Sequence, residues 1–108
     1  MYRIINDKLT KVIKLARNKN QMGTRKKLTD YLETLKYEDI KIIQTIMYIG
    51  RDTSYGIKNE EIDSDKLFQE FYISLTWDEN KYIEINQIIE KEPLDKYLTR
   101  GMELLKIK

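Results

Sequence analysis

The sequence predicts an all-α fold, a compact single domain over residues 1–108 with five or six short helices around a central apolar helix at about residues 37–49. Only one proline and four glycines interrupt the 108 residues, so few positions force the chain out of a helix. Apolar residues recur three and four positions apart along most of the chain, which is the spacing of one helix face. No segment shows the alternation of apolar and polar residues that is typical of a half-buried strand.

The first two helices are expected at about residues 6–17 and 24–35. Asn6 is a plausible N-cap, because its side chain can accept a hydrogen bond from an unpaired backbone N–H. A polar connector at 18–23 separates the two helices. The apolar stripes that define them consist of Leu9, Val12, Ile13 and Ala16 in the first helix and Leu28, Tyr31, Leu32 and Leu35 in the second.

The third helix, at about 37–49, is apolar on most of its circumference, which is typical of a helix at the centre of a domain. Gly50 directly follows it, and we expect this glycine to end the helix in the left-handed conformation. Arg51 and Asp52 then lie at a fixed corner. They either satisfy loop and helix-end backbone groups or present a guanidinium to an anion.

Three further helices are expected in the second half of the chain. One begins near Ser64, and another is predicted to begin at Thr76 because a hydroxyl residue followed three positions later by Glu79 has the spacing of a capping box. That helix should run to about residue 91. A sixth helix should have Pro93 in its first turn, and Gly101 within its apolar stripe should let another helix approach closely.

Charge is distributed unevenly, although the net charge is only +2. Residues 1–27 form a basic N-terminal helix and connector with nine basic residues and one acid, whereas residues 28–108 hold eleven basic and seventeen acidic residues. This asymmetry indicates either an anion-binding surface or a basic segment that lies on an acidic body. The candidate contacts to an anion or nucleic acid are Lys8, Lys11, Lys14, Arg17, Arg25, Lys26 and Lys27.

The residues available for chemistry argue against an enzyme. The chain has no histidine and no cysteine, so it lacks the commonest general base and the usual ligands of zinc, haem and iron–sulfur clusters. We expect no cofactor and no catalytic or metal site. Four acids before the fourth helix do not match the calcium-loop pattern and are interpreted as an acidic helix start favoured by the dipole. They are Glu60, Glu61, Asp63 and Asp65.

Several positions lie off the apolar stripes and are candidates for exposed contacts. Leu15 and Ile73 are the candidate protein contacts, to another protein or to a second copy of the chain. Tyr2 and Tyr55 are candidates for exposed aromatic residues. The longest central uncharged run is nine residues, 42–50, and a membrane span needs about twenty. We therefore expect no membrane partner and a cytoplasmic protein.

Two segments resemble a bacterial domain family of unknown function. The first is Met47-Tyr48-Ile49-Gly50-Arg51-Asp52, which is similar to the family's apolar helix ending in Met-aromatic-aliphatic-Gly-Arg-Gly-Asp, with one glycine missing. The second is a helix of the form Pro-Leu-x-x-Tyr-Leu-x-x-Gly at residues 93–101. The resemblance covers about residues 28–105. It implies a helical fold and no known activity, substrate or cofactor.

The function expected from these observations is that of a small non-catalytic protein-interaction or regulatory module. One alternative is nucleic-acid binding through the basic N-terminal region, which would be salt-dependent because it would rest on phosphate contacts. Another alternative is an inhibitor of a host or defence protein, encoded by a mobile element. The chain is short enough for such an inhibitor, but no residue points to that role.

Overall fold

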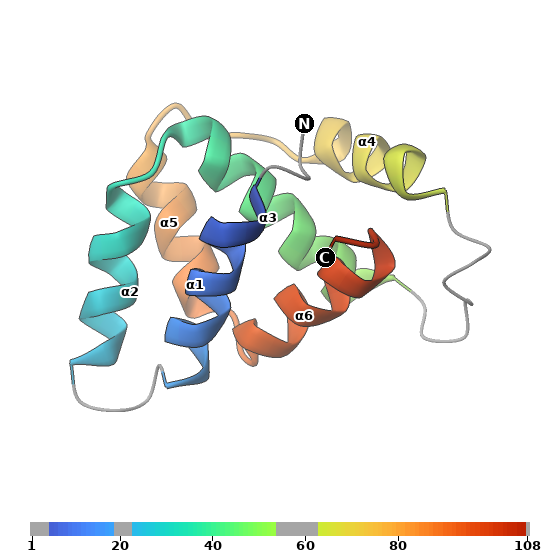
Figure 1. The fold of residues 1–108 in the computed structure, drawn as a ribbon. Helices are drawn as coiled ribbons and strands as arrows, with labels where there is room; N and C mark the ends of the chain where they lie inside the picture. The colour runs from blue at the N-terminus through green and yellow to red at the C-terminus, as the bar shows by residue number, and fades with distance from the viewer. Residues whose placement is uncertain (1–4, 19–22, 54–62, 108) are drawn as a thin grey trace.

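The computed structural model describes residues 5–18, 23–53 and 63–107. This part of the chain contains six helices and no strand, which confirms the predicted all-α fold (Figure 1). The helices are α1 (Asn6–Arg17), α2 (Thr24–Glu33), α3 (Tyr37–Asp52), α4 (Ser64–Ser74), α5 (Lys81–Glu90) and α6 (Leu94–Leu104).

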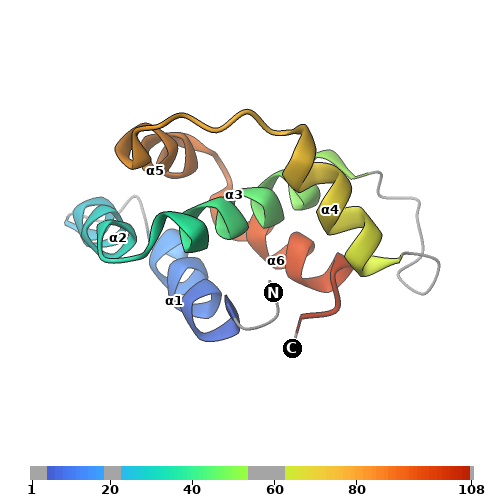
Figure 2. The same cartoon turned by 90° about the horizontal axis from the view of Figure 1, so that it is seen from above.

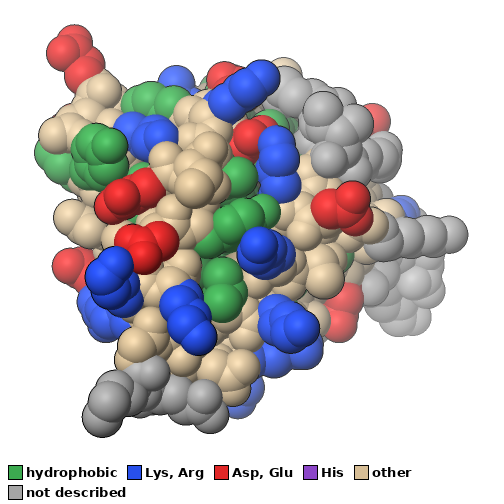
Figure 3. Space-filling view, turned by 60° about the vertical axis from the view of Figure 1, so that its left-hand side comes forward, with side chains coloured by type: hydrophobic (Ala, Val, Ile, Leu, Met, Phe, Trp, Pro, Cys, Tyr) green, Lys and Arg blue, Asp and Glu red, His purple; other side chains and the backbone are tan. Residues whose placement is uncertain are grey.

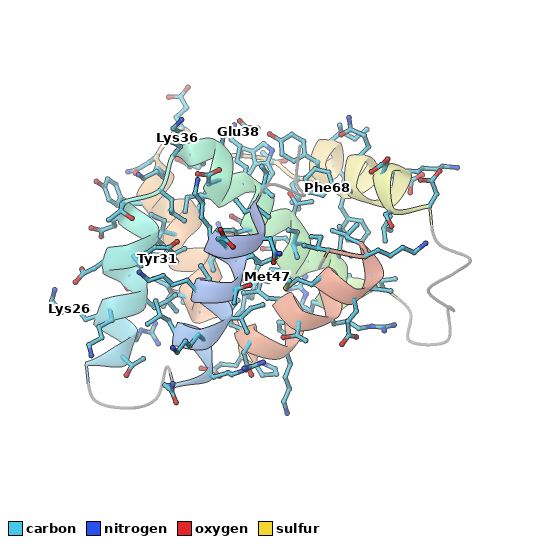
Figure 4. The ribbon with its side chains drawn as sticks, in the orientation of Figure 1. Lys26, Tyr31, Lys36, Glu38, Met47 and Phe68 are labelled. Atoms are coloured by element: carbon cyan, nitrogen blue, oxygen red, sulfur yellow. The ribbon has the colours of Figure 1, made fainter. Side chains whose placement is uncertain are left out.

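Helix α3 runs through the middle of the molecule, as the sequence predicts (Figure 2). Helices α4, α5 and α6 pack directly on it, and α1 packs on α2 and α6. Ile43, Ile46 and Met47 of α3 have no exposed surface, because neighbours cover this helix on several sides. Figure 4 places Met47 in the interior of the bundle and Phe68 on the side of α4 that faces α3.

Two glycines allow α3 and α6 to pack at very short distance. A Cβ at Gly101 would lie 2.3 Å from the carbonyl oxygen of Ile46, and a Cβ at Gly50 would lie 1.8 Å from the carbonyl oxygen of Tyr97. Both distances are far below van der Waals contact, so only glycine fits at either position. The close approach predicted for Gly101 is therefore confirmed.

The predicted end of the third helix is wrong. Gly50 does not terminate α3 in the left-handed conformation, because α3 continues through Asp52 and the one glycine with positive φ in the described ranges is Gly23. The backbone of α6 requires a residue without a side chain at position 50. Since that requirement comes from packing, Gly50 lies within the helix that it was expected to end.

The bounds of α1 and the start of α4 match the prediction, but the cap of α1 does not. Asn6 is the first helical residue, and the N-cap is Ile5, which makes no side-chain capping bond. Asn6 instead accepts a hydrogen bond from the hydroxyl of Thr10, at 3.4 Å. Ile5 is 1% exposed, so burial of its side chain holds the first turn where a polar cap was expected.

Helix α5 begins four residues later than the capping box predicts, since its N-cap lies at position 80 and not at position 76. Its N-cap is Asn80, whose side chain accepts from the N–H of Tyr82 at 2.9 Å. The side chain of Asp78 accepts from the N–H of Asn80 at 2.7 Å, and the carbonyl of Asp78 accepts from the hydroxyl of Tyr37. These bonds hold residues 76–80 as a non-helical connector, so the box beginning at Thr76 opens no helix.

Of the acidic cluster before α4, two members can be placed. Asp63 is the N-cap of α4 and accepts from the N–H of Lys66 at 3.2 Å, and Asp65 lies in the first turn. Glu60 and Glu61 lie outside the described residues, as do Tyr2 and Tyr55. In the part of the chain that is described, no helix has the length and apolar character needed to span a membrane.

Candidate functional site

Helix α1 separates two surface grooves. The first, here called the α1–α2 groove, has a volume of about 590 Å³. The second, the α1–α6 groove, has a volume of about 390 Å³. Thr10 and Lys14 line both grooves, so the two form one continuous surface across the exposed side of α1. The described residues that line the grooves are Asp7, Thr10, Lys11, Lys14, Leu15, Asn18, Thr24 and Lys27 for the first and Thr10, Ile13, Lys14, Arg17, Thr99 and Met102 for the second.

The charges along these grooves are mostly positive. We call Lys11, Lys14, Arg17 and Lys27 the basic face; all four are exposed, and each lines at least one groove. Among the described residues of both linings, Asp7 is the one acid. Figure 3 shows the side of the molecule that α1 and α2 present, with Lys and Arg side chains gathered around hydrophobic side chains. The surface is therefore suited to an anionic partner.

The structure divides the seven predicted anion contacts into two groups. Lys8 pairs with Asp39 at 2.7 Å, and Lys26 pairs with Asp30 at 2.9 Å. Figure 4 shows Lys26 pointing away from α1, and its hydrogen bond to Asp30 raises its pKa. Intramolecular ion pairs therefore already use two of the seven cations.

The other predicted cations are exposed and differ in their surroundings. The ammonium of Lys11 lies 4.5 Å from the centroid of the Tyr31 ring, an attractive cation–π geometry. Burial raises the pKa of Tyr31, and the nearby charge of Lys8 partly opposes that effect. Of the seven predicted contacts, the cations that form no ion pair and no ring contact with the described residues are Lys14, Arg17, Arg25 and Lys27.

The start of α2 departs from the usual placement of charge on helices. Its first turn carries Arg25, Lys26 and Lys27 and no acid, and its N-cap, Gly23, supplies no side-chain bond. The N-terminus of a helix has a partial positive charge, so cations there are unfavourable. Local rules are often broken where function requires it, and a bound anion would relieve the repulsion at this end of the α1–α2 groove.

The predicted corner of Arg51 and Asp52 is the last turn of α3. The two side chains form a bidentate pair, with Nε to Oδ1 at 2.7 Å and Nη2 to Oδ2 at 3.1 Å, and this hydrogen bonding raises the pKa of Arg51. The guanidinium also lies 4.7 Å from the centroid of the Tyr48 ring, which Lys91 approaches to 5.6 Å. Because Asp52 already occupies the guanidinium, the arrangement favours a structural role.

Leu15 and Ile73 do not form one surface. Leu15 is half-buried against the core and lines the α1–α2 groove, whereas Ile73 of α4 is 76% exposed. Figures 1 and 2 place α1 and α4 on different sides of α3. The structure thus brings Leu15, but not Ile73, together with the basic face.

The sequence did not identify the contribution of α6 to this surface. Thr99 and Met102 line the α1–α6 groove, although the spacing of Met102 from Leu94 and Leu98 places it on the apolar stripe of its helix. Met102 is only half-buried, because it lies where α6 meets α1. Periodicity identifies an apolar face, but the edge of that face becomes visible only once the neighbouring helix is placed.

Buried polar groups occur between α3 and α5. Glu84 is 2% exposed and Gln44 is 3% exposed, and Oε2 of Glu84 and Oε1 of Gln44 have no hydrogen-bond partner. The side-chain amide of Gln44 donates to Gln87 at 3.3 Å. Within the described ranges, no group of three or more His, Cys, Asp or Glu residues is placed to hold a metal ion.

Comparison of the chain with protein-family models, with curated proteins and with solved structures found no match. The family resemblance noted from the sequence stays a prediction. Any functional inference therefore comes from the geometry of the basic face and its two grooves.

Proposed function

We propose that this protein is a non-catalytic interaction module that binds an acidic protein partner through the basic face of α1 and α2. The observation that carries this proposal is the pair of adjoining grooves on α1, where exposed cations without ion pairs surround apolar side chains. Lys14 lies where the two grooves meet, and the residues near the centre of an interface contribute most to affinity.

The apolar part of the surface favours a protein over a nucleic acid. Leu15 lies in one groove, and Ile13 and Met102 lie in the other. Protein interfaces combine a buried apolar centre with a polar rim, whereas phosphate contacts need only cations and hydrogen-bond donors. A partner with carboxylates around an aliphatic side chain would match both parts of this face.

Nucleic-acid binding is the second candidate, and the run of Arg25, Lys26 and Lys27 at the start of α2 favours it. Helix N-termini are common phosphate sites. Against it, Lys8 and Lys26 already form ion pairs, which reduces the number of cations available for phosphate. A mobile-element inhibitor would be one form of the protein-binding function, and the genes beside its own would identify it.

Site-specific photo-crosslinking tests the proposed function. A photoreactive residue replaces Thr10, which lines both grooves, in the full chain, and a control chain carries it at Lys66, an exposed residue of α4. After irradiation in an extract of the native cell, the Thr10 position should give a discrete adduct whose size nuclease leaves unchanged. An adduct that nuclease reduces to the size of the free chain would establish the nucleic-acid alternative, and equal labelling from both positions would refute a specific face.

A further inference from the structure

We infer that the α1–α2 groove holds an acidic amphipathic helix of the partner, about three turns long, lying parallel to α1. This inference rests on the proposed function and adds the form, direction and chemistry of the bound segment. Four features carry it: the length of the groove, the absence of a strand edge among the described residues, the position of Asp7, and the side chain of Leu15.

The groove extends along the whole of α1. Its lining on this helix begins at Asp7 and ends at Asn18, just past the last helical turn. Eleven steps of about 1.5 Å give a length of roughly 16 Å, which equals about three turns of a second helix. From α2, Thr24 and Lys27 of the first turn line the groove, and Figure 1 shows this turn at the same end of the molecule as the last turn of α1.

The surroundings favour a helix over an extended segment. The described residues form helices and connectors with no strand, so no sheet edge is available to pair with an incoming backbone. An extended segment in this groove would therefore gain few main-chain hydrogen bonds. A helix satisfies its own backbone groups and uses only its side chains for contact.

The charges in the groove set the direction of the bound helix. Asp7 lies at one end, and Lys14 and Lys27 lie toward the other. A helix has a partial positive charge at its N-terminus and a partial negative charge at its C-terminus. The favoured orientation places the partner's N-terminus beside Asp7 and its acidic C-terminal half beside the lysines, parallel to α1.

Leu15 provides the apolar contact. It is half-buried and packs against the core, so its position is fixed while part of its side chain faces the groove. An aliphatic side chain of the partner can cover it, with carboxylates on either side reaching Lys11 and Lys14. The bound helix therefore needs leucines on one face and acids beside them.

Three labelled synthetic peptides of the same composition test the inference by fluorescence anisotropy. The first is a lactam-bridged helix of about three turns, with one leucine stripe and glutamates in its C-terminal half. The second is the same bridged helix with the glutamates in its N-terminal half. The third has the residues of the first in scrambled order and no bridge. We expect the first to bind the full chain at least about tenfold more tightly than either of the others.

Variants assign the binding to the groove. Lys14→Glu and Lys27→Glu should each weaken binding of the first peptide several-fold, and Leu15→Ala should weaken it without changing the salt dependence. Lys66→Glu, with the same charge change on α4, should have no effect. Circular dichroism of each variant confirms that it is folded.

The remaining outcomes separate the inference from the proposed function. Equal affinity for all three peptides, lost in Lys14→Glu, would refute an oriented helix and leave an acidic partner in place. Equal affinity for the two bridged helices alone would refute the direction. No binding of any peptide at low salt, with binding of single-stranded DNA that Lys14→Glu abolishes, would refute both the inference and the proposed function.

Discussion

At the scale of single residues, the strongest constraint on the fold is that two positions between α3 and α6 must be glycine. Gly50 and Gly101 each face the backbone of the opposite helix where α3 and α6 meet. The sequence stripe indicates the role of Gly101, but Gly50 stands before polar residues and looks like a helix terminator. Only the position of α6 distinguishes a glycine needed for packing from one needed for a turn.

Replacing either glycine by alanine should therefore destabilise the protein by at least about 3 kcal/mol, the upper part of the usual range for overpacking. The added methyl would meet backbone atoms, which cannot move without displacing a helix. Urea unfolding measures the change. Glu103→Ala, at an exposed position of α6, is the control and should stay within about 0.5 kcal/mol of the wild type. Wild-type stability of Gly50→Ala would contradict the α3–α6 packing.

A second prediction at this scale concerns Tyr31. Burial raises its pKa above the ordinary value of 10.0, so the unfolded chain loses this proton at lower pH than the folded protein does. The contribution of Tyr31 to the free energy of unfolding is therefore fully present below pH 10. It is lost as the pH rises through the pKa that Tyr31 has in the folded protein.

Tyr31→Phe removes this titration and keeps a ring beneath Lys11. The variant should match the wild type closely at pH 7 and lose less stability between about pH 9.5 and 11. Denaturant unfolding at a series of pH values tests this, and both proteins share the titration of the lysines. Parallel curves for the two proteins would show that Tyr31 does not contribute.

At the scale of helices, the sequence identifies apolar stripes more reliably than helix ends. The bounds of α1 and the start of α4 match the prediction, because in both helices the first apolar residue of the stripe lies about one turn after the helix start. The start of α5 does not match, since Asp78 and Asn80 bond to nearby backbone N–H groups and hold the preceding residues outside the helix. A capping box at Thr76 and a cap at Asn80 are both compatible with the local sequence.

The two possible N-caps of α5 predict different effects of alanine substitution on stability. Asn80→Ala should lower the free energy of unfolding by about 1 kcal/mol, because the N–H of Tyr82 loses its acceptor. Thr76→Ala should change it by less than about 0.5 kcal/mol. Thermal or denaturant unfolding of both variants measures these changes. A larger loss of stability in Thr76→Ala than in Asn80→Ala would place the helix start at the capping box.

The start of α2 provides a test that links stability to binding. Arg25→Glu places an acid where the helix dipole favours one, and it should raise stability by about 0.3–1 kcal/mol. The same change should weaken binding of an acidic partner, since it reverses a charge beside the α1–α2 groove. Unfolding and anisotropy measurements on one preparation test both effects.

Arg17→Glu in the last turn of α1 is the matched control. It reverses a charge at the opposite helix end, so it should lower stability while also weakening binding. If Arg25→Glu instead lowered stability, the cations of α2 would be structural and would give no indication of a partner.

At the scale of the whole molecule, the basic N-terminal region does not lie uniformly on an acidic body. Lys8 and Lys26 pair within the chain, whereas Lys14, Arg17, Arg25 and Lys27 have no such partner among the described residues. The sequence predicts the basic segment, and it allows its cations either to pair with acids of the same chain or to stay available to an anionic partner. Lys26 meets Asp30 because the two lie four residues apart in α2, whereas Lys8 meets the distant Asp39 of α3, a pairing that composition does not determine.

The central claim is that the basic face of α1 and α2 binds an acidic protein segment. The most direct measurement is the perturbation of backbone amide signals in proton–nitrogen correlation spectra, as the bridged acidic helix or single-stranded DNA is added to the full chain. With the peptide, the largest shifts should fall on α1 and on the first turns of α2, and in Lys14→Glu they should require several-fold more peptide. Shifts confined to α4 or α5, or a response to DNA and not to the peptide, would contradict the claim.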